Sequence, residues 1–116
     1  MLKLGHIGII AKDPKALADW YKDVLGFEVI LEMKKEGRPP IYFLKGDEGS
    51  YIEVLPPTFE RHLGFVVDDF DETVKTLKSK GIVLENARGT SMGWTIGYFK
   101  DIEGNQLEIV HMPKPL

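Results

Sequence analysis

The sequence contains no cysteine, which excludes disulfides, thiolate metal ligands and a cysteine nucleophile. No apolar run approaches the roughly 20 residues of a membrane-spanning helix, and the first residues lack the basic start and long apolar stretch of an export signal. There is no basic excess either, since the formal net charge is −3 and lysines are interspersed with acids. These absences argue against nucleic-acid and membrane partners and favour a cytoplasmic protein that acts on a small molecule.

The composition is that of a globular domain. Hydrophobic residues make up 43% of the 116 residues and charged residues 28%, a balance that allows a buried core and argues against disorder. We therefore expect one domain over residues 1–116. It would consist of a first module at 1–57 and a second at 58–116, joined by a short proline-containing linker.

An internal repeat defines these two modules. The stretch HIGIIAKDPKALADWYKDVLGFEV aligns with HLGFVVDDFDETVKTLKSKGIVLE, so that His6 matches His62. Further along, IEV aligns with LEI, so that Glu53 matches Glu108. Each module is expected to follow the same order of one strand, one helix and three strands.

The first helix is predicted from its ends, because Asp13 is a good N-cap, Pro14 suits the first helical position and Gly26 suits the end. Its buried stripe is expected to contain Leu17, Trp20, Tyr21, Val24 and Leu25. The second helix is expected from about Asp69–Asp71 to Gly81. The predicted strands are Lys3–Ala11, Phe27–Met33, Ile41–Lys45, Tyr51–Leu55, Arg61–Val67, Val83–Asn86, Thr95–Lys100 and Gln106–Val110. The predicted fold is α+β: two βαβββ modules forming an eight-stranded curved mixed sheet with a concave metal-binding cleft.

One histidine and one carboxylate in each module are predicted to share a face. Side chains alternate along a strand, so Ile7 and Ile9 would face the helix, whereas His6 and its counterpart His62 would point away from it. Glu53 and Glu108 would do the same in the fourth strand of each module. If the modules are related by an approximate two-fold axis, the four side chains meet.

Two imidazoles and two carboxylates are a competent ligand set for Ni²⁺, Co²⁺, Mn²⁺, Fe²⁺ or Zn²⁺, and the pattern does not choose among these metals. Unpartnered buried carboxylates would be costly, so a cation between Glu53 and Glu108 is expected. Taken singly, a strand histidine is more often hydrogen-bonded or exposed, and a strand glutamate more often solvated. The repetition in both modules favours metal binding.

Other polar and aromatic residues have weaker signals. Arg38 and Arg88 are expected in loops, where they could hold an anionic substrate group or be solvated. The loops 35–40 and 87–94 are expected to cover the cleft. Three aromatic residues could line a pocket or pack in the core: Phe43, Trp94 and Tyr98. His111 is expected at the surface.

The motifs together resemble the vicinal oxygen chelate superfamily, which includes glyoxalase I, methylmalonyl-CoA epimerase, fosfomycin-resistance transferases, extradiol dioxygenases and bleomycin-resistance proteins. The matching segments cover nearly the whole chain: HIGI at residue 6, WY to LGF at 20–27, YIEVL at 51, RHLGFVVDD at 61 and DIEGNQLE at 101. The His, Glu, His, Glu pattern is similar to glyoxalase I. The resemblance implies four metal ligands, with Glu108 or Glu53 as the base that moves a proton next to a metal-bound oxygen.

The resemblance therefore implies a glyoxalase-type lyase or isomerase acting on a small α-oxo or α-hydroxy carbonyl compound through a metal-chelated enediolate. The alternatives are an extradiol-type dioxygenase, a thiol transferase, or a non-enzymatic protein that binds ligands as bleomycin-resistance proteins do. The short connection from Glu53 to His62 and the lack of an arginine in the first strand argue against glutathione. Open sheet edges favour a homodimer.

Overall fold

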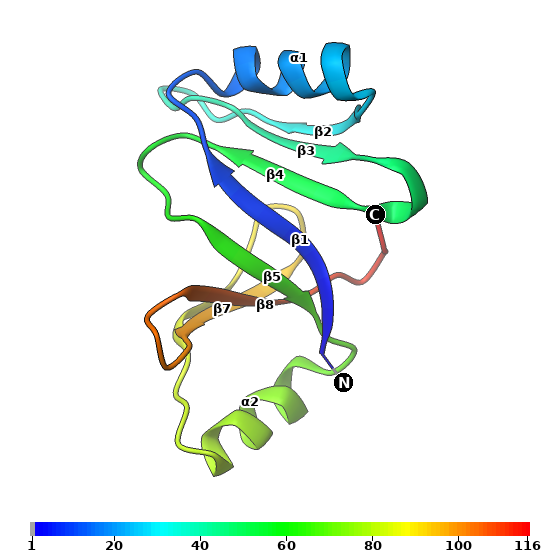
Figure 1. The fold of residues 1–116 in the computed structure, drawn as a ribbon. Coiled ribbons are helices and arrows are strands. Elements are labelled where there is room, and N and C mark those ends of the chain that lie inside the picture. The colour runs from blue at the N-terminus through cyan, green and yellow to red at the C-terminus, as the bar shows by residue number, and fades with distance from the viewer. Residues whose placement is uncertain (1) are drawn as a thin grey trace. The chain divides into compact units, whose positions relative to one another are not determined.

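The computed structural model describes residues 2–116, which form two compact units: 6–61, and 62–116 together with 2–5. Among these residues there are two α-helices and eight strands, as predicted (Figure 1). The elements of the first βαβββ repeat are β1 (Lys3–Ile10), α1 (Pro14–Leu25), β2 (Glu28–Met33), β3 (Ile41–Lys45) and β4 (Tyr51–Leu55). Those of the second are β5 (His62–Val66), α2 (Phe70–Ser79), β6 (Glu85–Gly89), β7 (Thr95–Lys100) and β8 (Gln106–His111). A 3₁₀ turn, Asp47–Gly49, joins β3 to β4.

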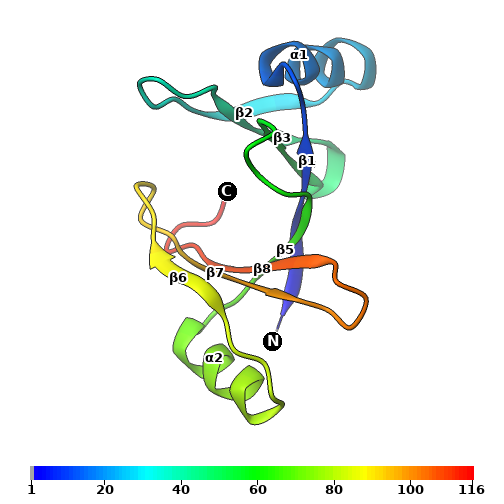
Figure 2. The same ribbon diagram turned by 90° about the vertical axis from the view of Figure 1, so that its left-hand side faces the viewer.

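The strands of the first repeat follow the order β2-β3-β4-β1. Strand β1 runs parallel to β4, and the other two pairs are antiparallel. The strands of the second repeat follow the matching order β6-β7-β8-β5, with β5 parallel to β8. In each unit the helix covers one face of the strands (Figures 1 and 2). The predicted α+β class, with mixed strand directions, is confirmed.

Helix α1 begins and ends where the sequence predicts. The Asp13 side chain accepts a hydrogen bond from the Ala16 N–H at 3.1 Å, and Pro14 follows it as the first helical residue. Gly26 closes the helix with φ of 75°, a left-handed conformation that glycine adopts without a steric penalty. The local signals of this helix are therefore sufficient to set both of its ends.

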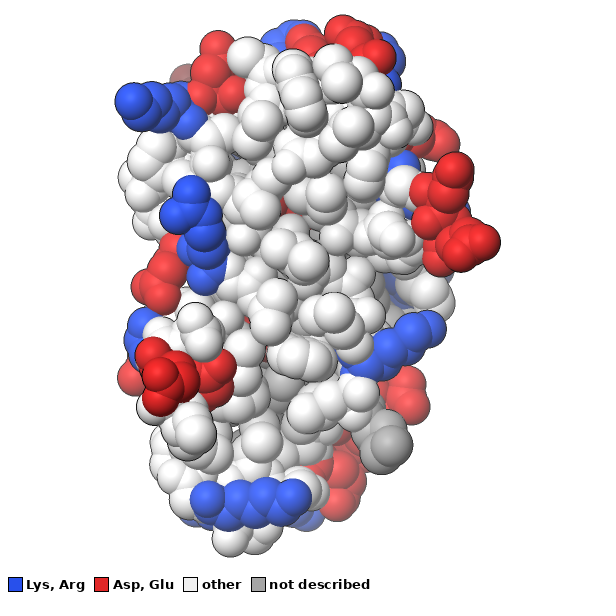
Figure 3. Space-filling view, viewed as in Figure 1, with Lys and Arg blue, Asp and Glu red and all other residues white. Residues whose placement is uncertain are grey.

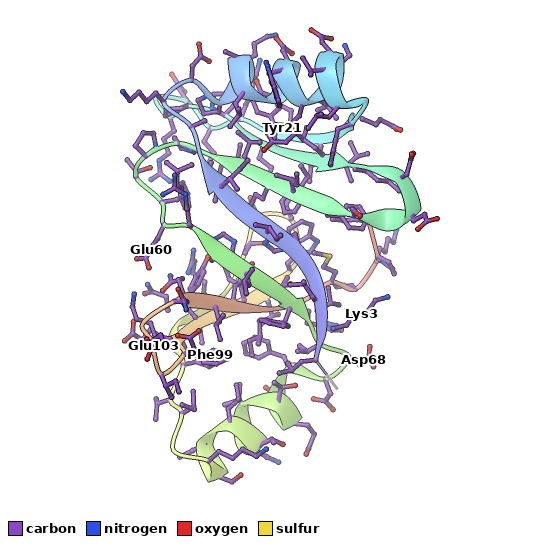
Figure 4. All side chains as sticks on the ribbon, viewed as in Figure 1. Lys3, Tyr21, Glu60, Asp68, Phe99 and Glu103 are labelled. Atoms are coloured by element: carbon purple, nitrogen blue, oxygen red, sulfur yellow. The ribbon has the colours of Figure 1, made fainter. Side chains whose placement is uncertain are left out.

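The predicted buried stripe of α1 is only partly correct. Pro14 and Ala18 are buried, and Leu17 and Tyr21 pack against the core of the first unit. Figure 4 shows Tyr21 extending from α1 toward the strands. Trp20, Val24 and Leu25, however, are about half exposed. The buried face of α1 therefore centres on Ala18, Leu17 and Tyr21 and not on these three larger residues.

The core of the first unit lies between α1 and the strands. Leu44 and Val54 are fully buried there together with Tyr42, and Ile9 packs beside them. Ile7, which was expected to pack on the helix with Ile9, is 44% exposed and is not part of this core. The core centres on Val54, whose partner on β1 is Ile9.

Tyr42 brings a polar group into this core. Burial raises the pKa of its hydroxyl to about 12, and a hydrogen bond to Glu32 on the neighbouring strand adds to the effect. The hydroxyl is therefore protonated at neutral pH. It lies on the helix-covered face, away from the candidate site.

In the second repeat, α2 starts one residue after its N-cap Asp69, whose side chain accepts from the Glu72 N–H at 3.0 Å. Strand β6 starts two residues later than predicted and ends at Gly89, so Arg88 lies on a strand and not in a loop. Asn86 adopts a left-handed φ of 53°, and the β6–β7 register shifts between Glu85 and Arg88. The segment 87–89 is therefore part of the sheet and not of a cleft-covering loop.

The hairpin between β7 and β8 is held by Asp101. Its carboxylate accepts hydrogen bonds from the Asn105 side chain at 2.8 Å and from the backbone N–H groups of Asn105 and Glu103, both at 2.9 Å. These bonds, the one from the Asn105 side chain foremost, lower the pKa of Asp101. The turn fixes the register in which β8 returns beside β7, and that register places Glu108.

Charge is distributed without a dominant sign. On the face shown in Figure 3, basic and acidic side chains are interspersed within each unit, and neither kind forms a continuous patch. No helix among residues 2–116 is long and apolar enough to cross a membrane.

Gly5 provides a stability test of the second unit. A Cβ atom at Gly5 would lie 2.6 Å from Cγ2 of Val66, and a β-branched side chain cannot easily rotate away. We expect Gly5→Ala to lower the free energy of unfolding by about 1–3 kcal/mol. Gly89→Ala is the matched control, because its nearest neighbour would be the Trp94 carbonyl oxygen at 3.9 Å. Urea denaturation followed by circular dichroism measures both variants, and equal effects would contradict the steric argument.

Candidate metal centre

His6 and Glu53 form a buried pair in the first repeat. Glu53 on β4 has Gly8 on β1 and Phe43 on β3 as its two cross-strand partners. His6 lies two residues before Gly8 and therefore projects from the same face of β1. Its Nε2 is 3.4 Å from Oε1 of Glu53, and its ring contacts Phe43 edge to face with 5.3 Å between centroids. The parallel pairing of β1 with β4 brings this histidine and carboxylate together.

His62 and Glu108 form the equivalent pair in the second repeat. Glu108 on β8 is partnered by Gly64 on β5 and by Tyr98 on β7. His62 lies two residues before Gly64, and its Nε2 is 3.7 Å from Oε1 of Glu108. The His62 ring contacts Tyr98 edge to face with 6.3 Å between centroids. A buried histidine next to a carboxylate is thus found at matching positions of both repeats.

All four side chains are buried, with 3–9% of their surface exposed. The glycine opposite each glutamate contributes no side chain, so the carboxylate has a bulky neighbour on only one side: Phe43 in the first repeat and Tyr98 in the second. Buried carboxylates are stable when they are paired or bound to a cation. Two imidazoles and two carboxylates without a thiolate suit a divalent metal ion of the first transition series.

The structure describes these as two pairs, each within its own unit. Convergence of all four residues on one ion, which the sequence predicts, stays a prediction. Each pair also has an aromatic neighbour that contacts its imidazole ring: Phe43 in the first repeat and Tyr98 in the second. Their signal in the sequence is the repeat itself, which aligns FLK at residue 43 with YFK at residue 98.

The remaining candidate residues have different positions. Arg38 lies in the β2–β3 turn and is exposed, as expected. Arg88 lies on β6, with its guanidinium carbon 5.8 Å from the centre of the Tyr98 ring. Trp94 is partly buried at the β6–β7 turn, where its backbone N–H donates to the Thr90 hydroxyl at 3.3 Å. His111 is partly buried and not fully exposed, because its Nδ1 lies 3.1 Å from the Val67 carbonyl oxygen.

Comparison with curated proteins gives two bacterial relatives. YaeR of Escherichia coli (strain K12) is 34% identical over 90% of this chain and 92% of its own length. YwkD of Bacillus subtilis (strain 168) is 32% identical over the same shares of the two chains. Both are described as uncharacterized proteins.

Among solved structures, similar ones include methylmalonyl-CoA epimerases. One, in complex with methylmalonyl-CoA and NH4+, is 25% identical, covers 99% of this chain and 97% of its own, and has a TM-score of 0.80. A variant of the Streptomyces coelicolor methylmalonyl-CoA epimerase in complex with 2-nitronate-propionyl-CoA is 26% identical, covers 97% and 98%, and has a TM-score of 0.78. The family model of the Glyoxalase/Bleomycin resistance protein/Dioxygenase superfamily matches residues 3–109. With most of the chain matched and the paired histidines and carboxylates in both repeats, this protein belongs to that superfamily.

Proposed function

We propose that this protein is a metal-dependent enzyme of the lyase or isomerase type, which moves a proton on the carbon next to a carbonyl group. One observation supports the proposal above the others: the buried His–Glu pair occurs twice, at matching positions of the two repeats, with N–O distances of 3.4 and 3.7 Å. A single buried pair is common as a structural feature. Two such pairs at matching register positions are expected if both pairs contribute to one function.

The cation would be held by His6 and Glu53 from the first repeat and by His62 and Glu108 from the second. When bound, a divalent cation supplies Lewis acidity, which stabilises negative charge on the oxygens of a carbonyl substrate and makes the adjacent C–H more acidic. The donor set is compatible with Ni²⁺, Co²⁺, Mn²⁺, Fe²⁺ and Zn²⁺ alike.

The protein's own part in the reaction is proton transfer. A carboxylate oxygen of Glu108 or Glu53 accepts the proton from the carbon and later returns it. Return by the same carboxylate can move the proton to a neighbouring atom, as in an isomerase. Removal by one carboxylate and return by the other, on the opposite side of the carbon, inverts its configuration, as in an epimerase. Two carboxylates make either route available.

The solved epimerases support this reaction class, since racemising a carbon beside a carbonyl requires this kind of proton transfer. The substrate we propose is a small α-oxo or α-hydroxy carbonyl compound with two neighbouring oxygens. An acyl-CoA thioester of the kind bound by the epimerases is a narrower possibility within the same chemistry. We also propose a homodimer, which light scattering after size-exclusion chromatography tests.

The superfamily also contains dioxygenases, and two histidines with one carboxylate are the ligand pattern of many non-haem iron oxygenases. Preferential binding of iron over the other metals would be needed for this alternative. Oxygen uptake by the Fe²⁺-loaded protein would support it. A purely ligand-binding role would be supported by the absence of any metal binding.

The test has two steps. Purified metal-free protein is titrated with each divalent cation by calorimetry, and we expect one ion per chain. The loaded protein is then incubated in D₂O with hemithioacetals, 2-oxo acids and a methyl-branched acyl-CoA, and loss of the α-proton signal is followed by NMR. Metal-dependent exchange with at least one class supports the proposal. Tight metal binding with oxygen uptake and no exchange would overturn it.

A further inference from the structure

The two repeats differ next to their His–Glu pairs, and at each position compared below the second repeat has the more polar residue. Phe43 is the cross-strand partner of Glu53, and Tyr98 is the cross-strand partner of Glu108. At this position, therefore, only the second repeat has a hydroxyl group. On the next strand, Met33 faces Ile41 in the first repeat. The residue in this register in the second repeat is Arg88, which faces Ile96. An apolar surrounding in one repeat thus corresponds to a polar, cationic one in the other.

Arg88 lies on the face of the second repeat that carries the site. Cross-strand partners project to the same side, and Ile96 shares its side of β7 with Tyr98. The guanidinium carbon of Arg88 is 5.8 Å from the centre of the Tyr98 ring, and Tyr98 in turn contacts the His62 ring. The three side chains therefore form a row that runs from exposed β6 to the buried histidine.

The guanidinium is held in place. One terminal nitrogen donates to the Asn86 carbonyl oxygen at 3.1 Å, and the left-handed Asn86 presents that oxygen at the shift in β6 register. A guanidinium has five N–H donors, so most of them remain for another acceptor. Among the described residues of the same unit, no carboxylate forms an ion pair with Arg88.

A fixed guanidinium with available donors matches the geometry of an oxyanion, and stacking on an aromatic ring strengthens its preference for one orientation. We propose that Arg88 binds an anionic group of the substrate, remote from the reacting carbon, and thereby makes the enzyme selective for substrates with a second charged end. The inference rests on the proposed function, and it specifies the substrate class of the same site.

The test uses a matched pair of probes that share a 2-oxo acid end. 2-Oxoglutarate carries a second carboxylate, 2-oxohexanoate carries an ethyl group in its place, and 2-oxo-4-phosphonobutanoate carries a phosphonate. Dissociation constants are measured by calorimetry on both Ni²⁺-loaded and metal-free protein. Arg88→Met introduces the residue of the first repeat, Arg88→Lys keeps the charge without the fork, and Lys78→Met removes a charge from exposed α2 as the control.

We expect the wild-type protein to bind 2-oxoglutarate or the phosphonate more tightly than 2-oxohexanoate. Arg88→Met is expected to weaken binding of the preferred anionic probe about 10- to 100-fold and to leave the affinity for 2-oxohexanoate unchanged. The affinity of Arg88→Lys for the anionic probe should lie between those of the wild-type protein and Arg88→Met. Lys78→Met should change neither affinity. No preference in the wild-type protein, or a preference that survives Arg88→Met, would overturn the inference. If instead no metal binds but an Arg88-dependent preference persists, the proposed function fails and the role of Arg88 stands.

Discussion

Replacing either His6 or His62 with alanine is expected to lower the affinity for a divalent cation by more than about 100-fold. Changes in groups that only orient metal ligands already cost 10- to 100-fold, and removing a ligand itself should cost more. Calorimetric titration of the metal-free variants with Ni²⁺ and Zn²⁺ measures the effect. His111→Ala is the control, since the third histidine lies against the Val67 carbonyl oxygen, outside both pairs.

The stoichiometry makes this prediction sharper than the affinity alone. If His6 and His62 bind one shared ion, the wild-type protein takes up one ion per chain, and each single substitution removes that binding. If each His–Glu pair binds its own ion, the wild-type protein takes up two, and each substitution leaves the other intact. The second result would contradict the shared centre while leaving the structure of each pair unchanged.

Replacing Glu108 with glutamine is expected to slow metal-dependent exchange of the substrate α-proton by about 10²- to 10⁴-fold, the usual contribution of a general base. The amide cannot accept the proton, although its oxygen can still face a cation. The measurement is NMR exchange in D₂O at saturating metal, with the bound metal quantified in each variant. Glu103→Gln is the control, because Glu103, labelled in Figure 4, is exposed in the turn between β7 and β8.

Glu53→Gln, examined in the same way, distinguishes one base from two. If Glu108 alone moves the proton, Glu53→Gln with full metal occupancy retains most of the exchange rate. If both carboxylates act on opposite sides of the carbon, as an epimerase requires, each variant loses inversion. Undiminished exchange in both variants at full occupancy would contradict proton transfer by either glutamate.

The ends of the helices were predictable because their signals are local. Asp13, Pro14 and Gly26 act within one helical turn of their own positions, so no distant part of the chain is needed to set them. The buried side of α1 was less predictable. Whether Trp20 or Ala18 faces the strands depends on how closely the helix approaches them, and this is a property of the packed unit.

Strand β6 was displaced from its predicted position for a related reason. Its residues pair with β7 through a register shift between Glu85 and Arg88, and Asn86 adopts a left-handed φ at this shift. The expected loop at 87–89 is consequently part of a strand, and Arg88 is fixed on a sheet face. Alternation along the sequence could not show this, since the register shift changes which side each residue faces.

The repeat in the sequence was enough by itself to select His6, Glu53, His62 and Glu108, because two copies of one folding unit place matching residues in matching environments. The tertiary structure decided which histidine contacts which carboxylate, and that Phe43 and Tyr98 pack against the imidazoles. Those contacts depend on parallel pairing between strands separated by a helix and two further strands, β1 with β4 and β5 with β8. Hydrogen bonds between distant strands set that register, and they form only when the chain is folded.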